Sequence, residues 1–228
     1  MILVLLPGLD GTGLLFKPFL ACLPLKIKTK VIAYPAEEAL DYEALVNYVR
    51  PRLPNEDFTL LAESFSGPVA FLLAQEKPKH LKSIIFAASF LSAPRPRLQK
   101  VVQKIPLFSF PIPKLVIQHA LIGKEVEQSM IDLFKQAVEK VPAKILNYRL
   151  RQITKLELTG RVEEVKCSYI QAVNDKLVLE NSLDLFKERI EHLNVVSIKG
   201  PHFILQAQAK ICADFVVSEI TSGVRSKK

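Results

Sequence analysis

A serine placed between a buried strand and a helix constrains the fold of this chain more than any other feature of the sequence. The apolar run Phe58–Leu61 predicts a strand, and a helical pattern starts a few residues later, so Ser64 falls on the sharp turn between them. Such a turn exposes the serine hydroxyl above the carboxyl end of a parallel sheet. The residues two before and two after it, Ala62 and Ser66, are small, as the crowding across the turn requires, and Ser66 is the alternative nucleophile. Taken alone, the stretch is equally consistent with an ordinary Ser-Gly turn between a strand and a helix.

Other polar and glycine-rich residues follow predicted strands in the same way. The first strand runs into residues 7–13, where three glycines allow backbone N–H groups to approach a ligand. Two later strands are followed by Asp175 and by His202. Because the carboxyl ends of parallel strands meet at one edge of a sheet, these side chains are expected to lie near Ser64. The chain order Ser64, Asp175, His202 is the order found in one of the common folds that carry a Ser-His-Asp triad.

The chemistry of a serine nucleophile selects its partners among these residues. A serine hydroxyl needs a base that is neutral near physiological pH within hydrogen-bond reach, and histidine fits. Of the four histidines, only His202 follows the carboxyl end of a strand. The others precede strands or lie in an inserted segment: His80, His192 and His119. Asp175 would orient the imidazole and stabilise its charged form, with Glu180 and Asp184 as the alternatives.

The remaining pattern alternates strands with helices and predicts an α/β fold. Buried apolar runs predict six strands, at residues 2–6, 31–34, 58–61, 83–88, 169–173 and 195–198. Helical periodicity is expected over residues 40–49, 69–75, 183–190 and 204–220. This alternation without repeats is typical of a mostly parallel, doubly wound sheet covered by helices on both faces. A chain of 228 residues suits a single domain of this kind, spanning residues 1–228.

The alternation breaks in residues 94–164, a segment that carries six prolines and two helical stretches. Prolines prevent one continuous helix, so the segment must fold back in short pieces. We interpret it as a helical lid inserted over the predicted site, with Phe108 and Phe110 lining a pocket for an apolar acyl group. An ordinary set of packing helices is the alternative, and the two interpretations are compatible.

Four stretches of the chain resemble the α/β-hydrolase fold family. Residues 7–13 resemble its oxyanion loop, 62–67 its nucleophile elbow, 174–175 its acid turn and 200–202 its histidine loop. The resemblance covers essentially the whole chain. It departs from the family in two ways, because the elbow lacks both flanking glycines and the usual N-terminal antiparallel strands are missing. The resemblance implies a serine esterase or thioesterase with a triad of Ser64, Asp175 and His202.

The resemblance also implies where the negative charge of the reaction would be held. The backbone N–H groups of Leu9 and Phe65 would be the oxyanion donors, and such groups contribute about 3–4 kcal/mol each to transition-state stabilisation. Asp10 and Glu63 flank the site. Either carboxylate could contact the substrate or cap a turn, and we treat Asp10 as a candidate substrate contact.

Charge and cysteine content limit the partners and the compartment. The net charge is +8, but Lys and Arg are spread along the chain without an aromatic-rich recognition module, which favours a solvated surface over a nucleic-acid partner. An acidic carrier such as acyl carrier protein or coenzyme A stays open as a partner. Three scattered cysteines, without a signal peptide or a membrane-spanning run, favour a cytoplasmic protein. No metal-ligand spacing or dinucleotide fingerprint occurs, so neither a metal nor another cofactor is expected.

Together these observations predict a cofactor-free serine hydrolase. It would cleave a small-molecule carboxylic ester or thioester through an acyl-enzyme intermediate, with an apolar acyl group. An acyltransferase that uses the same triad while excluding water is the alternative among enzymes. A non-catalytic ligand-binding protein on the same fold is the alternative outside them.

Overall fold

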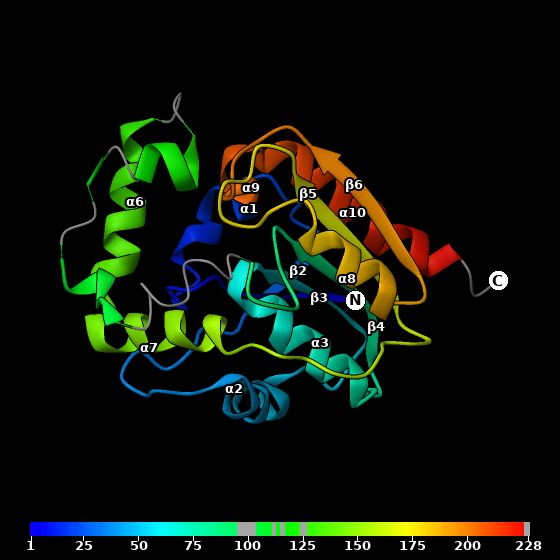
Figure 1. Cartoon of the computed structure of the whole chain (residues 1–228). Helices are drawn as coiled ribbons and strands as arrows, with labels where there is room; N and C mark the ends of the chain where they lie inside the picture. The colour runs from blue at the N-terminus through cyan, green and yellow to red at the C-terminus, as the bar shows by residue number, and fades with distance from the viewer. Residues whose placement is uncertain (95–103, 111–112, 115–116, 124–126, 226–228) are drawn as a thin grey trace.

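The chain folds around a six-stranded sheet in which each pair of neighbouring strands is parallel (Figure 1). The structure is a computed structural model that describes residues 1–94, 104–110, 113–114, 117–123 and 127–225. Its strands are β1 (Ile2–Leu6), β2 (Lys28–Val31), β3 (Phe58–Glu63), β4 (Leu81–Ala87), β5 (Lys166–Ala172) and β6 (Leu193–Ile198). They lie in the order β2-β1-β3-β4-β5-β6, which confirms the predicted doubly wound, parallel sheet.

Helices cover both faces of this sheet. They are α1 (Lys17–Ala21), α2 (Tyr42–Val49), α3 (Gly67–Gln75), α8 (Ser182–Arg189), α9 (Ile204–Ala207) and α10 (Ala209–Arg225). One hydrophobic cluster joins a face of the sheet to α2, α3 and α8, and another joins the opposite face to α1, α9 and α10 (Figure 1). The central strand β3 is buried at every position, as expected for a parallel strand that is covered on both sides. This two-sided burial produces the continuous apolar runs that predicted the strands.

The segment between β4 and β5 forms a group of short helices beside the sheet (Figure 1). Its described elements are η5 (Leu107–Ser109), the π-helix η6 (Ile117–Ile122), α6 (Gln128–Glu139) and α7 (Ala143–Thr154). Ile131 and Phe134 of α6 pack against Leu15, which lies in the stretch that follows β1. Ile145 and Leu146 of α7 form a second small apolar cluster. The segment therefore packs on the region just beyond the carboxyl end of β1.

Several predicted strands differ by up to three residues at their ends, and two predicted elements differ in position or continuity. The strand predicted at residues 31–34 lies three residues earlier, as β2. That prediction is wrong because β2 is an edge strand with all four residues exposed, and only its last residue, Val31, is apolar. Ile32 and Tyr34, which carry the apolar signal, are buried beyond the end of the strand. The helix predicted over residues 204–220 is divided at Gln208 into α9 and α10.

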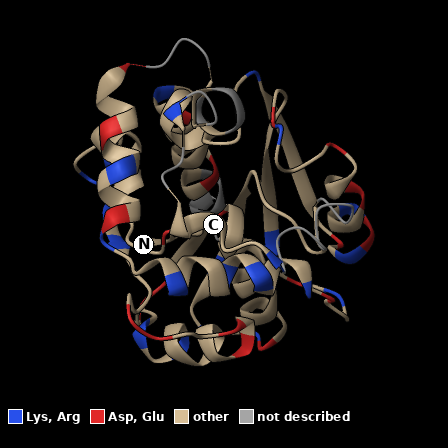
Figure 2. Cartoon of the chain, turned by 60° about the vertical axis from the view of Figure 1, so that its left-hand side comes forward, with Lys and Arg blue, Asp and Glu red and all other residues tan. Residues whose placement is uncertain are grey.

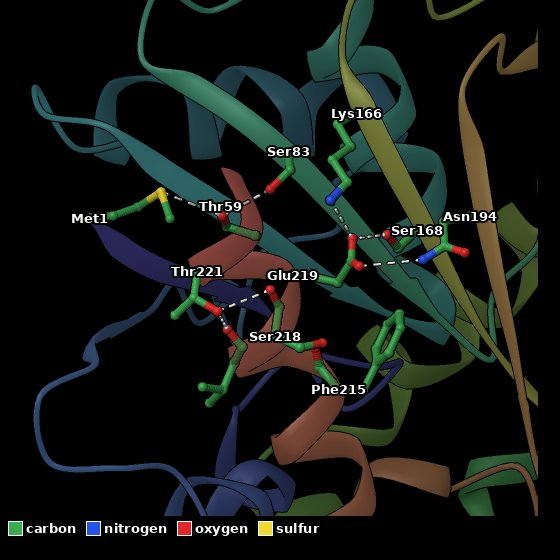
Figure 3. Close-up of polar contacts among 11 residues, drawn as sticks. Met1, Thr59, Ser83, Lys166, Ser168, Asn194, Phe215, Ser218, Glu219 and Thr221 are labelled. Carbon is green, nitrogen blue, oxygen red and sulfur yellow. Dashed lines mark hydrogen bonds and ion pairs between the residues drawn. The ribbon is translucent and has the colours of Figure 1, made fainter. Parts of the chain in front are cut away.

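A buried carboxylate ties α10 to the sheet near the amino ends of β5 and β6 (Figure 3). Glu219 accepts hydrogen bonds from Ser168 Oγ at 2.5 Å and from Asn194 Nδ2 at 3.3 Å. Its carboxylate also forms an ion pair with Lys166 Nζ at 3.1 Å. A buried polar group that is paired in this way stabilises the packing of the helix instead of opposing it. The network lies at the end of the sheet opposite to the predicted site.

The charged surface and the cysteines bear on the expected partners and reactivity. Positive and negative side chains are interspersed over the elements seen in Figure 2. Cys167 and Cys212 are buried, and burial raises the pKa of both thiols to about 12. Both thiols therefore stay protonated near neutral pH and are poor nucleophiles. In the part of the chain that the structure describes, no helix combines the length and the apolar character needed to cross a membrane.

Candidate active site

Ser64 lies on the turn that connects β3 to α3. The chain passes from β3 into the short 3-10 helix η3 (Ser64–Ser66) and continues directly into α3. The backbone of Ser64 has φ = 47°, a left-handed conformation that non-glycine residues rarely adopt. Ser89 Oγ donates a hydrogen bond to the Ser64 carbonyl at 2.7 Å and helps to hold the turn. A strained serine at the junction of a strand and a helix is the arrangement that the sequence predicts.

The structure brings Ser64, His202 and Asp175 together in one hydrogen-bonded chain. Ser64 Oγ lies 2.9 Å from His202 Nε2, and His202 Nδ1 lies 2.7 Å from Asp175 Oδ2. The side chains of His202 and Asp175 are each 4% exposed. The second carboxylate oxygen of Asp175 accepts hydrogen bonds from the backbone N–H groups of Leu177 and Val178. These bonds fix the carboxylate, which in turn favours the tautomer with Nδ1–H and leaves Nε2 free to accept the serine proton.

The alternative residues are placed elsewhere or are already engaged. Ser66 is buried, and its hydroxyl contacts Tyr34 and donates to the Pro7 carbonyl, so it does not face a substrate. Glu180 and Asp184 are exposed on the surface. His80 faces Asp57, and His192 is exposed beside Glu191. The side chain of His119 lies outside the described part of the structure.

The loop after β1 borders the nucleophile and carries Leu9, one of the two predicted oxyanion donors. Gly11 N donates to the Gly8 carbonyl at 3.0 Å, which folds the loop into a tight turn. Asp10 Oδ2 accepts hydrogen bonds from the backbone N–H and the hydroxyl of Thr12, so this carboxylate caps the turn. Asp10 also lines the cavity beside Ser64, so the two roles that the sequence leaves open for it are compatible. Phe65, which carries the other predicted donor, directly follows Ser64 in η3. The first N–H groups of a helix have no hydrogen-bond partner within the helix, so they are available to a ligand.

A cavity of about 300 Å³ opens on Ser64 and His202. Its lining is almost wholly apolar, and much of it comes from the inserted segment: Leu107, Phe108, Leu121, Phe134, Val138, Leu146, Leu150 and Ile153. Described residues of the segment thus form part of the cavity wall beside Ser64. Phe108 lines the cavity, whereas Phe110 is 63% exposed and is not among the lining residues. Phe108 lies within η5 and Phe110 directly follows it, so the expectation that Phe110 lines the pocket is wrong, while Phe108 does line it.

No family model matches the chain, and no curated protein matches it. Solved structures do match. A lipase-esterase related protein from Clostridium acetobutylicum ATCC 824 aligns with a TM-score of 0.77 at 13% identity, over 95% of this chain and 93% of that one. A structure described with the carboxylesterases of Nitrososphaera gargenis gives 0.78 at 16% identity, over 98% and 91%. The enol-lactonase from Burkholderia xenovorans LB400 gives 0.73 at 14% identity, over 96% and 90%.

The chain has the α/β-hydrolase fold. The tight turn at Ser64 needs a residue without a side chain at Gly67, a position outside the G-x-S-x-G pattern. A Cβ on Gly67 would lie 1.7 Å from Ser89 Oγ, so a larger residue there would displace the serine that supports the Ser64 carbonyl. Ser66 occupies the position where the family has its second glycine, and its hydroxyl is hydrogen-bonded to Tyr34 and to the Pro7 carbonyl. The missing flanking glycines of the α/β-hydrolase elbow are thus compatible with a tight turn.

Glu63, directly before the nucleophile, is a buried acid for which the sequence offers no definite role. Its side chain is 3% exposed and lines the cavity, and its Oε1 accepts a hydrogen bond from Gln206 Nε2 at 2.8 Å. Burial raises the pKa of this carboxyl to about 7, and the negative charge of Asp10 acts in the same direction. The hydrogen bond from Gln206 and the field of His202 lower the pKa and limit the rise. The only signal of this buried acid in the sequence is its position next to Ser64.

We expect the Glu63→Gln variant to remove a pH-dependent loss of stability. Because the pKa of Glu63 rises from 4.5 to about 7 on folding, the folded state binds a proton that the unfolded state releases, and stability falls as the pH rises through that interval. Over this pH interval the free energy of unfolding should fall by about 3 kcal/mol. Urea unfolding of both proteins at pH 4.5 and pH 8 measures the difference. The same pH dependence in the variant and the wild type would show that Glu63 is not the group responsible.

Proposed function

We propose that this protein is a serine hydrolase that cleaves carboxylic esters or thioesters through an acyl-enzyme intermediate. One observation carries the proposal: the hydrogen-bonded chain from Asp175 through His202 to Ser64 ends at the wall of an apolar cavity. A nucleophile, a base and an orienting acid with this geometry are what acyl transfer requires. The cavity beside them would hold an apolar acyl group.

The first half of the proposed reaction forms the acyl-enzyme. Ser64 Oγ attacks the carbonyl carbon of the substrate while its proton passes to His202 Nε2. Negative charge then develops on the carbonyl oxygen, where the N–H groups of Leu9 and Phe65 are expected to receive it. Collapse of this intermediate expels the alcohol or thiol, which takes the proton from His202. Asp175 stabilises the imidazolium while it exists.

The second half repeats these steps with water as the nucleophile. His202 accepts a proton from water, the resulting hydroxide attacks the acyl carbon, and Ser64 leaves with the proton returned through His202. The free acid and the original enzyme are the products. No other group needs to be oxidised or reduced, so the Ser64, His202 and Asp175 side chains supply all the proton transfers of the cycle.

Two further observations support the substrate class. The similar structures include one described with carboxylesterases and an enol-lactonase, which indicates that this fold can carry ester chemistry. The net charge of +8 is compatible with an acidic carrier, so a thioester carried on coenzyme A or on acyl carrier protein is included in the proposal as an alternative to a free ester.

Fluorophosphonate labelling tests the proposal directly. The probe phosphonylates an activated serine, and mass spectrometry of the digested protein identifies the modified residue. We expect modification of Ser64, followed by turnover of members of a panel of p-nitrophenyl esters and acyl thioesters. Release of free acid distinguishes hydrolysis from transfer to an added alcohol. A protein that is neither labelled at Ser64 nor active on any member of the panel would contradict the proposal.

We also expect kcat/KM to rise with acyl length until the cavity is filled. Each buried methylene contributes about 0.8 kcal/mol, which corresponds to about a fourfold increase in kcat/KM. Phe108→Ala removes part of the cavity wall and should shift the preferred length towards longer chains. Phe110→Ala is the matched control, because this side chain is exposed and outside the cavity. A flat length profile, or the same shift in both variants, would mean that the cavity does not hold the acyl group.

A further inference from the structure

A buried arginine of the inserted segment holds the loop that carries Leu9. Arg149 of α7 is 2% exposed although it comes from a helix outside the sheet. Its Nη1 donates hydrogen bonds to the carbonyl oxygens of Leu9 at 3.1 Å and Asp10 at 2.7 Å. Its Nη2 donates to the carbonyl oxygen of Pro35 at 2.9 Å. A buried cation is costly unless its donors are paired, and here backbone carbonyls pair them.

The loop is shaped around this guanidinium. Gly11 has φ = 72°, and a Cβ at this position would lie 2.4 Å from Arg149 Nη1. Only a residue without a side chain lets the loop close over the arginine in this conformation. Arg149 also lies over the ring of Tyr34, 5.7 Å from its centroid. Tyr34 N in turn donates to the Gly11 carbonyl at 2.8 Å, so loop, tyrosine and arginine form one contact group.

The same helix forms part of the cavity wall. Leu146, Leu150 and Ile153 of α7 line the cavity that opens on the nucleophile. Asn147, which is buried, accepts a hydrogen bond from the backbone N–H of Phe108 at 3.0 Å and so joins α7 to η5 at the cavity wall. Arg149 itself is not among the lining residues. Through this arrangement α7 contacts the acyl cavity and the loop of Leu9 at once, while the arginine stays away from the substrate.

We propose that Arg149 is the positioning residue of the oxyanion hole, an inference that rests on the hydrolase function proposed above. The guanidinium holds the carbonyl groups of Leu9 and Asp10, and thereby restrains the backbone of the residue whose N–H is the expected oxyanion donor. The N–H of Leu9 lies in the same peptide plane as the Gly8 carbonyl, which accepts a hydrogen bond from Gly11 N at 3.0 Å. Arg149 holds the next two carbonyls, and Gly11 closes over its guanidinium, so the arginine maintains the turn that sets the direction of this N–H. A displacement of about 1 Å at a reacting centre can cost roughly 10²-fold in rate, so this contact has a large effect on turnover.

The test compares three variants on an ester and on the matching thionoester. Sulfur is a weaker hydrogen-bond acceptor than oxygen, so a thionoester gains little from an intact oxyanion hole and the ester gains much. In Arg149→Met we expect kcat for the ester to fall roughly 10²-fold, with KM changed less than about twofold and the ester-to-thionoester rate ratio reduced towards one. Arg149→Lys, which keeps one cationic donor, should lie between this variant and the wild type. Arg151→Met, which removes a partly exposed arginine from the last turn of the same helix, should behave like the wild type.

The outcomes separate this inference from the function on which it rests. Absence of Ser64 labelling and of ester turnover in the wild type would contradict the hydrolase proposal itself. An active Arg149→Met protein with an unchanged rate ratio would overturn the positioning role alone. If Arg149→Met does not fold, the Arg149→Lys variant decides in the same way: a reduced ratio supports the role, and the wild-type ratio at reduced thermal stability shows a purely structural contact.

Discussion

The Ser64→Ala variant is expected to lose covalent labelling by a fluorophosphonate and essentially all turnover. Ser64 Oγ is 2.9 Å from His202 Nε2 and opens on the apolar cavity, so this substitution removes the proposed nucleophile. Loss of the nucleophile from a triad lowers kcat by roughly 10⁵- to 10⁶-fold, because the residual rate comes from substrate binding and the oxyanion hole alone. Intact-protein mass spectrometry and ester turnover measure the two effects.

Ser66→Ala is the matched control for this experiment. Ser66 belongs to the same turn, but its hydroxyl is buried, contacts Tyr34 and donates to the Pro7 carbonyl. Its loss should lower stability by about 1 kcal/mol and leave labelling in place. Equal labelling of the Ser64→Ala and Ser66→Ala proteins would show that the nucleophile is neither residue or that both react.

Substitutions of the base and the acid are expected to have the next largest effects, and they should differ in size. His202→Ala removes the imidazole that is hydrogen-bonded to Ser64 Oγ and should lower kcat by roughly 10⁵- to 10⁶-fold. Asp175→Asn keeps the shape of the acid but loses the carboxylate that selects the Nδ1–H tautomer, and should lower kcat by roughly 10⁴-fold. Both effects are measured as kcat on the best ester of the panel, with thermal melting to confirm that each protein folds.

Glu180→Gln serves as the control for Asp175→Asn. Glu180 is exposed a few residues farther along the chain, while Asp175 has one carboxylate oxygen on His202 and the other on two backbone N–H groups. The control should keep the wild-type rate. A fully active Asp175→Asn protein, or a Glu180→Gln protein that loses activity, would move the acid away from Asp175.

The sequence is informative about the site because each of its groups follows a strand that contains an apolar run. Ser64 and Asp175 lie just beyond the largely buried strands β3 and β5, and such runs locate strands well. His202 follows the edge strand β6, which is only partly buried but still contains Val195 and Val196. The edge strand β2 lacks this signal because all its residues are exposed, and its position is predicted wrongly. The central sheet and the meeting of the three residues are thus predictable, while the exact position of the edge strand β2 is not.

Contacts made by single side chains across the fold could not be predicted. Arg149 looks like any other cation on an amphipathic helix, and only the packing of α7 on the loop after β1 shows that it is buried. Phe108 and Phe110 are alike in sequence, and the turn of η5 decides which one lines the cavity. Glu63 lies at the end of an apolar strand, where the sequence does not reveal that its charge is desolvated.

The strained Ser64 and the buried Glu63 before it also bear on how this sequence can have evolved. Ser64 at φ = 47° costs of order 1 kcal/mol relative to a relaxed backbone, and glycine at this position would avoid that cost. Glu63 adds the penalty of a desolvated carboxyl, which glutamine would avoid. A lineage that used this fold only to bind a ligand would gain stability from either change, each of which needs a single substitution. Selection for chemistry at this turn would retain both destabilising residues. Under selection for folding alone, substitutions that remove the strain and the buried carboxyl would be expected to accumulate.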